Sequence, residues 1–457
     1  MTSIALVVLD TLRKDHFDEH FDWLPGVRYE NAYSPSHWTV PVHASMFTGR
    51  YASELGVYAN SEKLDCPETV LAESLSENGY TTRAFSANGN ISDYFKFDRG
   101  FDDFRVNWRA EGWKEELEFK DAANVFDWKN FNAETDYNYP LRPIVGTLKC
   151  IFGEYDTLPS LKHGFNRKMR GPGSPKLSED PKDYGSKEAL EYVRGTEFGD
   201  DEFLFINLMD AHNPYQPPEE YRTVEPVRIH GLKATVEGPK VDDEHVRQAY
   251  DDSVRYLSDM YEKIFNEIRD DFDYIITLSD HGELLGEHDS WEHLCGIYPE
   301  LTHIPLSVYS DNLQDCVRDE MVNLLDIHTT VLETAGIDTS KIGHESRGRN
   351  FLDDFQPRET PTEFHGLSRL HIQSLDDEWL EKVSYMDVEL EGLVAPPTYY
   401  GYETFEGFVE DGEASLEDAL ARLEELVGEL EKRDMRQEEY DDMSDDVMDR
   451  LEDLGYA

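Results

Sequence analysis

Residues 4–10 read IALVVLD, six apolar residues in a row followed by an aspartate. An unbroken apolar run of this length predicts a strand buried on both faces, because a strand with one wet face would alternate polar and apolar side chains. Such strands belong to parallel sheets that helices cover on both sides. The run is too short for a membrane helix or for the apolar part of a signal peptide, and no basic residue precedes it.

Outward from this run, short apolar segments alternate with amphipathic ones. Helices are predicted at residues 66–80 and 243–269, where apolar side chains recur on one helical face. Further buried strands are predicted at residues 81–87, 203–208, 274–278 and 304–309. This alternation predicts an α/β fold, a sandwich with a largely parallel central sheet flanked by helices.

The stretch 106–185 does not follow this rhythm and is rich in Trp, Asn, Asp, Pro and Gly. We interpret it as an insertion, which either covers an active site or is a solvated excursion from the fold. We expect the catalytic domain to occupy residues 1–350 and to contain this insertion.

The last hundred or so residues have a different texture. Residues 383–410 alternate in polarity and are rich in Tyr and Val, which predicts a small antiparallel sheet. Ser415–Arg433 is predicted to be a helix, with Ser415 and Asp418 forming its capping box. We therefore expect a small C-terminal α+β subdomain at residues 351–457.

The chain of 457 residues carries 43 Lys and Arg against 97 Asp and Glu, a net charge of −54. Hydrophobic residues make up 39%, which is enough for a sizeable core and excludes wholesale disorder. The acidic excess argues against nucleic acid or an anionic membrane as partner, since surfaces that track phosphates need clustered Lys and Arg. Because the charge is spread along the whole chain, the composition resembles that of a cytosolic protein from an extreme halophile, where salt screens self-repulsion. An acidic mesophilic protein is the alternative.

Four cysteines stand at positions 66, 150, 295 and 316, without a CxxC pair or a zinc-finger spacing. An even number permits disulfides, but no pattern requires them, so we expect free thiols and a cytoplasmic location. The oligomeric state stays open.

Polar side chains follow three of the predicted strands. Asp10 comes after the first strand, His212 follows the strand at 203–208, and Asp280 and His281 follow the strand at 274–278. In an open α/β sheet this carboxyl edge is where ligands bind, and carboxylates with imidazole suit a divalent cation. Taken singly, each residue has a plainer interpretation as a turn, cap or hydrogen-bonded side chain.

Residues 37–50 read HWTVPVHASMFTGR, with Thr39 where a helix should begin and Pro41 inside its first turn. His43 lies four residues further on, near the same helical face. A hydroxyl at a helix N-terminus faces free N–H groups, which suits a nucleophile that attacks a sulfate or phosphate group. An ordinary helix cap is the alternative interpretation of Thr39.

Six segments together resemble the sulfatase-like family of the alkaline phosphatase superfamily. In chain order they are VVLDTLRKD, TVPVHASMFTGRYASELGV, LFINLMDAHNPYQPP, ITLSDHGELLGEH, NLLDIHTTVLETAGI and the final RLEDLGYA. They cover most of residues 1–350 in the family's order, plus the C-terminus. The resemblance implies an alkaline-phosphatase-like or sulfatase-like α/β sandwich that cleaves sulfate or phosphate esters of a small molecule or a glycan.

The resemblance also implies roles for single residues. Asp10, Asp280 and His281 would hold one divalent cation (Ca, Mg, Mn or Zn). Thr39 would complete that site and act as nucleophile through a covalent ester. The remaining implied roles are proton transfer to the leaving oxygen by His212, anion contacts from His43 and His293, and substrate binding by Asn88 and His288.

Some positions depart from the family pattern. Formylglycine sulfatases carry Cys or Ser as nucleophile, and Thr39 cannot yield that aldehyde, although it can attack directly, as in the superfamily's phosphoglycerol and phosphoethanolamine transferases. His43 occupies the place of an arginine, and His293 that of a lysine. A transferase or phosphodiesterase therefore remains an alternative to a sulfatase, as does a non-catalytic protein that binds anions or glycans.

Overall fold

The computed structural model describes residues 2–59, 61–107, 141–152, 184–353, 355–368, 377–412 and 414–433, with the single positions Thr157, Ser160, His371, Ile372 and Leu375. Most of the expected insertion at 106–185 lies outside the described residues, and so does the RLEDLGYA ending. Within the described part, no helix is long and apolar enough to cross a membrane.

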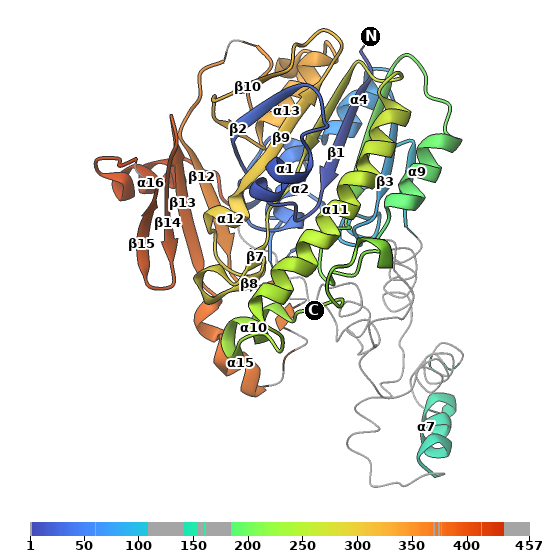
Figure 1. The fold of residues 1–457 in the computed structure, drawn as a ribbon, viewed down its shortest axis with the longest axis vertical. Coiled ribbons are helices and arrows are strands. Elements are labelled where there is room, and N and C mark those ends of the chain that lie inside the picture. The colour runs from blue at the N-terminus through green and yellow to red at the C-terminus, as the bar shows by residue number, and fades with distance from the viewer. Residues whose placement is uncertain are drawn as a thin grey trace.

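A nine-stranded sheet forms the centre of the described structure, in the order β10-β2-β9-β6-β1-β5-β3-β4, with β11 paired to β2 (Figure 1). Strand β1 lies in the middle and pairs in parallel with β5 and β6. Only β9 runs antiparallel to its neighbours, β6 and β2. The predicted largely parallel sheet is confirmed. The strands are β1 (Ile4–Leu9), β2 (Val27–Tyr33), β3 (Thr81–Ser86), β4 (Asp103–Val106), β5 (Glu202–Leu208), β6 (Tyr274–Leu278), β9 (His303–Tyr309), β10 (Cys316–Arg318) and β11 (Val322–Asn323).

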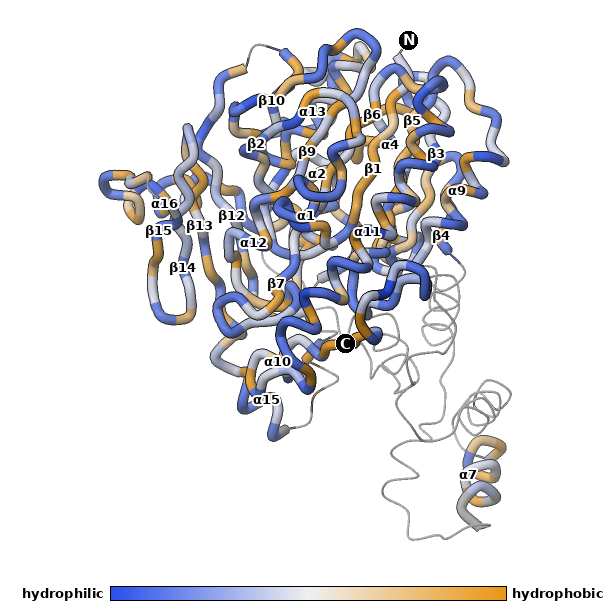
Figure 2. Tube along the Cα trace, viewed as in Figure 1, coloured by the Kyte–Doolittle hydropathy of each residue, from blue (hydrophilic) through white to orange (hydrophobic). Residues whose placement is uncertain are grey.

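The burial of β1 explains its composition. All six of its residues are fully buried, because helices cover both faces of the sheet. Figure 2 shows the hydrophobic residues gathered in the central strands, with hydrophilic residues on the outer turns and helices. The long apolar run at the N-terminus is therefore a central strand, as predicted.

Two groups of helices cover the sheet (Figure 1). Helices α2, α4 and α13 pack against one another, and α1 and α9 pack against the long α11. Asp242 caps α11 by accepting a hydrogen bond from the backbone N–H of Glu244. The helices of the two groups are α1 (Lys14–His20), α2 (Thr39–Thr48), α4 (Leu71–Glu77), α9 (Ser186–Gly195), α11 (Asp243–Ile268) and α13 (Asp326–Thr334). Shorter or peripheral elements are α3 (Ala52–Leu55), α7 (Leu141–Phe152), α10 (Gly231–Glu237), α12 (Pro299–Thr302), β7 (Leu284–Leu285) and β8 (Trp291–Glu292).

Two predicted helix starts were wrong. The helix expected from residue 66 begins at Leu71, where the Glu73 side chain accepts the N–H of the preceding Val70. The helix expected from Ser415 is α16 (Ala419–Gly428), and no Ser415–Asp418 capping box forms. Asp418 itself precedes the helix with a left-handed backbone (φ 57°), which turns the chain just before α16.

The C-terminal part contains a separate antiparallel sheet of four strands, β12 (Thr360–His365), β13 (Glu389–Ala395), β14 (Tyr399–Thr404) and β15 (Gly407–Asp411). Three of them confirm the sheet predicted at 383–410. Residue 383, however, is the last residue of helix α15 (Asp377–Val383), and residues 384–386 form a short helical turn after it. The fourth strand, β12, was not predicted.

Strand β12 also contacts the segment that leads into α2. The backbone N–H of Glu363 donates to the carbonyl oxygen of Pro35 (2.9 Å), and the Ser36 hydroxyl donates to the carbonyl oxygen of Glu363 (2.8 Å). The rings of Phe364 and His37 meet edge to face, with centroids 4.7 Å apart. The C-terminal sheet thus supports the chain immediately before Thr39.

All four cysteines are free thiols, as predicted, and Cys66, Cys150 and Cys295 are buried.

His328, on α13, should make the fold less stable in acid. It is fully buried, and neither ring nitrogen has a hydrogen-bond partner among the described residues. Burial lowers its pKa to about 3, whereas an unfolded histidine titrates near 6.5. Its contribution to stability is therefore complete above pH 6.5 and is lost as the pH falls toward 3, by about 2 kcal/mol at pH 5.

We expect His328→Leu to flatten the loss of stability between about pH 6.5 and 4 in urea unfolding. The same replacement at His245, near the start of α11, is the control and should leave the slope unchanged. Parallel stability curves for the wild type and His328→Leu would contradict the prediction.

Candidate active site

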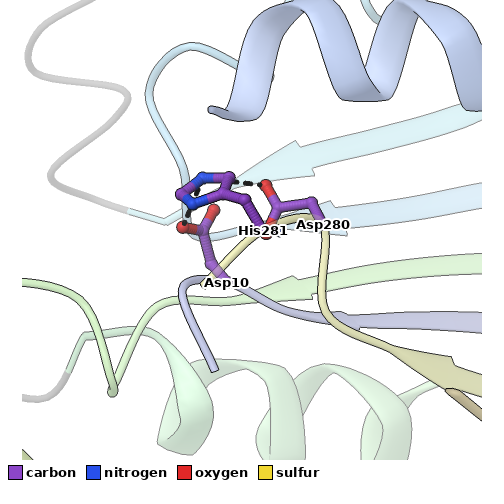
Figure 3. A group of neighbouring side chains, drawn as sticks. All are labelled: Asp10, Asp280 and His281. Atoms are coloured by element: carbon purple, nitrogen blue, oxygen red, sulfur yellow. Dashed lines mark hydrogen bonds and ion pairs between the residues drawn. The ribbon is translucent and has the colours of Figure 1, made fainter. Parts of the chain in front are cut away.

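Two neighbouring parallel strands bring their C-terminal residues together. Asp10 follows β1, and Asp280 and His281 follow β6 after one intervening serine. One ligand atom from each of the three side chains lies within 4.8 Å of the others, and all three residues are fully buried. Figure 3 shows the two carboxylates and the imidazole converging. The structure thus brings together the predicted metal-binding group.

The loop after β6 fixes how His281 is presented. Its Nδ1 bonds to the carbonyl oxygen of Gly282 (2.9 Å), so Nδ1 carries the proton and Nε2 keeps its lone pair. Nε2 lies 3.4 Å from Asp280 Oδ2 and 3.9 Å from Asp10 Oδ1. A Cβ atom at position 282 would come within 1.9 Å of the Glu300 carbonyl oxygen, so only glycine fits there.

Thr39 lies beside the same group at the first turn of α2. Its Oγ1 is 3.3 Å from His281 Nε2 and 3.3 Å from Asn88 Nδ2. Asn88 Nδ2 also donates to Asp10 Oδ2 at 2.7 Å. Thr39 is 2% exposed and begins the helix directly after Trp38, among N–H groups that have no partner inside the helix. The predicted nucleophile is therefore close to the predicted metal ligands.

The charge balance of this group fits a divalent cation. Burial raises the pKa of Asp10 to about 6, with a further increase from Asp280, and burial raises the pKa of Asp280 to about 7. Among the described residues, the basic side chains within 4.0 Å of their carboxylates are His43 and His281, and burial lowers the pKa of both histidines. Asp10 Oδ1 and Asp280 Oδ2 lack a hydrogen-bond donor in that same part of the chain. Oxygen and nitrogen ligands of this kind suit several metals.

His43 is fully buried one turn into α2. Its Nδ1 donates to the carbonyl oxygen of Thr39 (2.9 Å), and its ring lies 5.9 to 6.5 Å from the rings of Phe47, Phe97 and Phe205. Burial lowers its pKa to about 3. The side chain in the place of the family's arginine is thus a neutral ring.

Two further predicted histidines join the group. The ring of His293 lies 4.4 Å from that of His281 and 5.1 Å from that of His212, centroid to centroid. His212 Nδ1 bonds to the carbonyl oxygen of Asn213 at 2.6 Å. Burial lowers the pKa of both His212 and His293.

His288 is not brought to this group. Its ring stacks on Tyr298 with centroids 4.2 Å apart, and its Nε2 lies 3.1 Å from Glu300 Oε2. A left-handed backbone at His288 (φ 55°) and Asp289 (φ 52°) turns the chain between the loop that carries His281 and His293. The expectation that His288 binds substrate therefore gains no support from its position.

Two histidines near the site were missed, the buried His37 and the half-buried His371. The pKa of His37 is lowered by burial and then by His281, and the pKa of His371 by burial and then by His212. His37 stands two residues before Thr39, and that proximity was a usable signal. His371 reaches the site from the C-terminal part of the chain, and no local pattern marks it.

A family model described as Sulfatase matches residues 18–337, more than half of the chain. Among curated proteins, the uncharacterized sulfatase YidJ of Escherichia coli (strain K12) is 22% identical over 368 residues, covering 74% of this chain. The match covers 66% of that relative, slightly less than two thirds of its length.

Solved structures share the fold at low sequence identity. The phosphonate monoester hydrolase SpPMH from Silicibacter pomeroyi superposes with a TM-score of 0.62 at 16% identity, covering 96% of each chain. The phosphonate monoester hydrolase of Agrobacterium radiobacter gives 0.58 at 15% identity, covering 90% of this chain and 88% of that one. BT4656, solved with D-glucosamine-2-N,6-O-disulfate, gives 0.54 at 13% identity and covers 88% of each chain.

Proposed function

We propose that this chain, which belongs to the sulfatase family, is a hydrolase that cleaves sulfate or phosphoric esters with Thr39 as the nucleophile. One observation carries this proposal. Thr39 Oγ1 lies 3.3 Å from His281 Nε2, beside two buried carboxylates and at the open N-terminus of α2. This arrangement supports attack by a hydroxyl on a tetrahedral anion.

We propose that Asp10, Asp280, His281 and Thr39 hold one divalent cation. When bound, the cation would supply positive charge to the Thr39 oxygen and to the ester oxygens. The fit rests on the paired buried carboxylates and on the lone pair that His281 presents on Nε2. Asn88, which donates to Asp10, orients one of these carboxylates.

The chain's own residues would carry out a two-step reaction. The Thr39 oxygen bonds to sulfur or phosphorus, and the bond from that atom to the leaving oxygen breaks. His212 would donate a proton to the leaving oxygen, while the Thr39 hydroxyl gives up its proton to solvent, from which His212 is reprotonated. Water then attacks the ester on Thr39, which releases the anion and restores the hydroxyl. An alcohol in place of this water would make the enzyme a transferase.

The substrates to be assayed are chosen with the structural neighbours in mind. Two of them are named phosphonate monoester hydrolases, and one was solved with a disulfated glucosamine. Aryl sulfates, phosphate monoesters, phosphodiesters and phosphonate monoesters are therefore all assayed, each with Mg, Mn, Ca or Zn. Sulfated glycans extend the panel.

The test of the proposal is the covalent intermediate. The purified chain is quenched during turnover, and its intact mass is compared with that of Thr39→Ala treated in the same way. We expect a sulfuryl or phosphoryl adduct that peptide mapping assigns to Thr39. Turnover without an adduct on Thr39 in rapid-quench samples, or an adduct on another residue, would overturn the proposal. Anion binding without any turnover would favour the non-catalytic alternative.

We also propose the division of labour expected from the sequence. Residues 1–350, with the insertion at 106–185, would carry the chemistry, and residues 351–457 would form a C-terminal subdomain. The four-stranded sheet β12-β13-β14-β15, separate from the central sheet, supports this boundary. The contact of β12 with Pro35 and Ser36 supports a role for the subdomain in shaping the site.

We further propose that the enzyme works at high salt. Its net charge of −54 makes the folded chain repel itself unless ions screen the charge. We expect the melting temperature to rise steadily between about 0.1 and 3 M KCl, where the Debye length falls below about 10 Å. Sucrose at matched osmolality is the control for non-ionic effects. A melting temperature that is flat or falls with KCl would contradict the proposal.

A further inference from the structure

The ring of His293 is tied to a second buried side chain. Its Nδ1 lies 3.0 Å from Glu283 Oε1, within hydrogen-bond distance. Glu283 is fully buried and His293 is 6% exposed. A hydrogen bond at Nδ1 fixes the plane of the ring and leaves Nε2 as the nitrogen that can meet a ligand. The ring neighbours those of His281 and His212, at centroid distances of 4.4 Å and 5.1 Å.

The backbone before His293 is held in place as well. Glu292 is buried and has a left-handed backbone (φ 61°), a conformation that is unfavourable for a residue with a side chain. Its carboxylate accepts hydrogen bonds from Asn213 Nδ2 (2.5 Å) and from the backbone N–H of Gly231 (2.9 Å). A Cβ atom at position 231 would lie 2.3 Å from Glu292 Oε2, so glycine is needed for this approach.

The same asparagine also supports the other histidine. The backbone carbonyl oxygen of Asn213 accepts a hydrogen bond from Nδ1 of His212, while the side-chain amide of Asn213 donates one to Glu292. The amide is itself fixed by two bonds of 3.0 Å to the backbone of Ile229. One buried chain of hydrogen bonds therefore determines how His212 and His293 face the Thr39 site.

We propose that Glu283 is a positioning residue: its hydrogen bond to Nδ1 aims Nε2 of His293 at the sulfate or phosphate group on Thr39's side of the site. The proposal rests on the proposed function for the identity of that anion. Glu283 itself does not touch the substrate. In this arrangement Nδ1 accepts the hydrogen bond from the protonated carboxyl group of Glu283, so that Nε2 carries the ring proton and donates to the anion, in a part of the site where the described residues place no lysine.

The first test measures anion binding, which does not require turnover. Inorganic sulfate and inorganic phosphate are titrated into the full chain with Mn²⁺ present, by calorimetry. Glu283→Ala should weaken binding about 10-fold to 100-fold, the usual effect of removing the partner that orients a ligand-binding histidine. Glu283→Gln keeps a side chain that can bond to Nδ1 and should restore most of the affinity.

A double-mutant cycle separates positioning from a merely structural role. If Glu283 acts through His293, Glu283→Ala should have no further effect on anion affinity in a His293→Ala background. Glu202→Ala, which removes a buried glutamate at the start of β5, is the matched control and should lower the melting temperature without changing anion affinity. Additive losses in the cycle, or no rescue by glutamine in a variant that melts like the wild type, would overturn the proposal.

The outcomes also separate this proposal from the proposed function. If Thr39 forms no adduct but the cycle is non-additive, the positioning role stands and the proposed chemistry fails. If the adduct forms on Thr39 and the cycle is additive, the chemistry stands and the positioning role fails.

Discussion

Replacing Thr39 by alanine should lower kcat by about 10⁴-fold or more on every substrate that the enzyme turns over, because it removes the atom that forms the covalent ester. The side chain is 2% exposed and only one methyl and one hydroxyl group are lost, so the fold should survive. Steady-state and single-turnover rates, measured with a saturating divalent cation, give the size of the effect.

Thr39→Ser is the matched control, because it keeps the hydroxyl and removes only the methyl group. It should retain activity within about 10-fold of the wild type, whereas Thr39→Val keeps the shape and should be as inactive as alanine. Substantial turnover in Thr39→Val would mean that a water molecule attacks directly, and Thr39 would then be a metal ligand or a cap only.

The second large effect concerns cation binding and is measured without substrate. A cation that binds only the folded state at 100 times its dissociation constant stabilises it by about 2.7 kcal/mol. We expect a matching rise in the melting temperature of the wild type with the cation that supports turnover. Asp10→Asn and Asp280→Asn should each abolish this rise, because a neutral amide is a poor ligand and the remaining carboxylate carries too little charge.

Without a bound cation, replacing one of these aspartates by asparagine should stabilise the fold at high pH. The pKa values of Asp10 and Asp280 are raised to about 6 and about 7, mainly by burial, while unfolded aspartate titrates near 3.8. The two groups therefore favour the folded state at low pH, and this advantage is lost as the pH rises from about 4 through 7. At pH 8 without metal, Asp10→Asn should melt at a higher temperature than the wild type.

A second carboxylate–histidine group supplies the control. Glu19, His20 and Asp251 also place ligand atoms within 4.8 Å of one another, but they lie at least partly exposed. Asp251→Asn should leave the cation-dependent rise intact. An equal loss in Asp251→Asn and Asp10→Asn would mean that the measured cation acts elsewhere than at the Thr39 site.

The clustering of Asp10, Asp280 and His281 was predictable from the sequence for a geometric reason. Asp10 and Asp280 each follow an apolar run, and parallel strands end at one edge of a sheet. Thr39 was predictable because a helix start has its own local signals. The positions of Asp10, Asp280 and Thr39 depend on short stretches of chain, so local sequence patterns are enough to predict them.

Other parts of the site depend on contacts between distant segments. The hydrogen bond between Glu283 and His293 forms only because the chain turns between β7 and β8. No spacing rule predicts the left-handed residues of that turn. His371 comes near His212, and β12 contacts Pro35 and Ser36, only when the C-terminal part of the chain packs against the catalytic part. The position of His288 beside Tyr298 and Glu300 depends in the same way on packing, since a motif fixes sequence position and not the direction of a side chain. The helix starts at Leu71 and Ala419 depend on local backbone turns that apolar periodicity does not specify.

The pairing of β1 has a consequence for how the protein is made. Its partners, β5 and β6, follow it in the chain by about 200 and 270 residues. The hydrogen-bond partner of Pro35 and Ser36, Glu363 on β12, comes later still. During translation the first strand leaves the ribosome long before anything exists to cover it. The nascent N-terminal half therefore exposes an apolar strand until β5 and β6 have been made, which favours aggregation during that interval. A chain that stops before β12 would lack the hydrogen bonds to Pro35 and Ser36 that support the segment before Thr39.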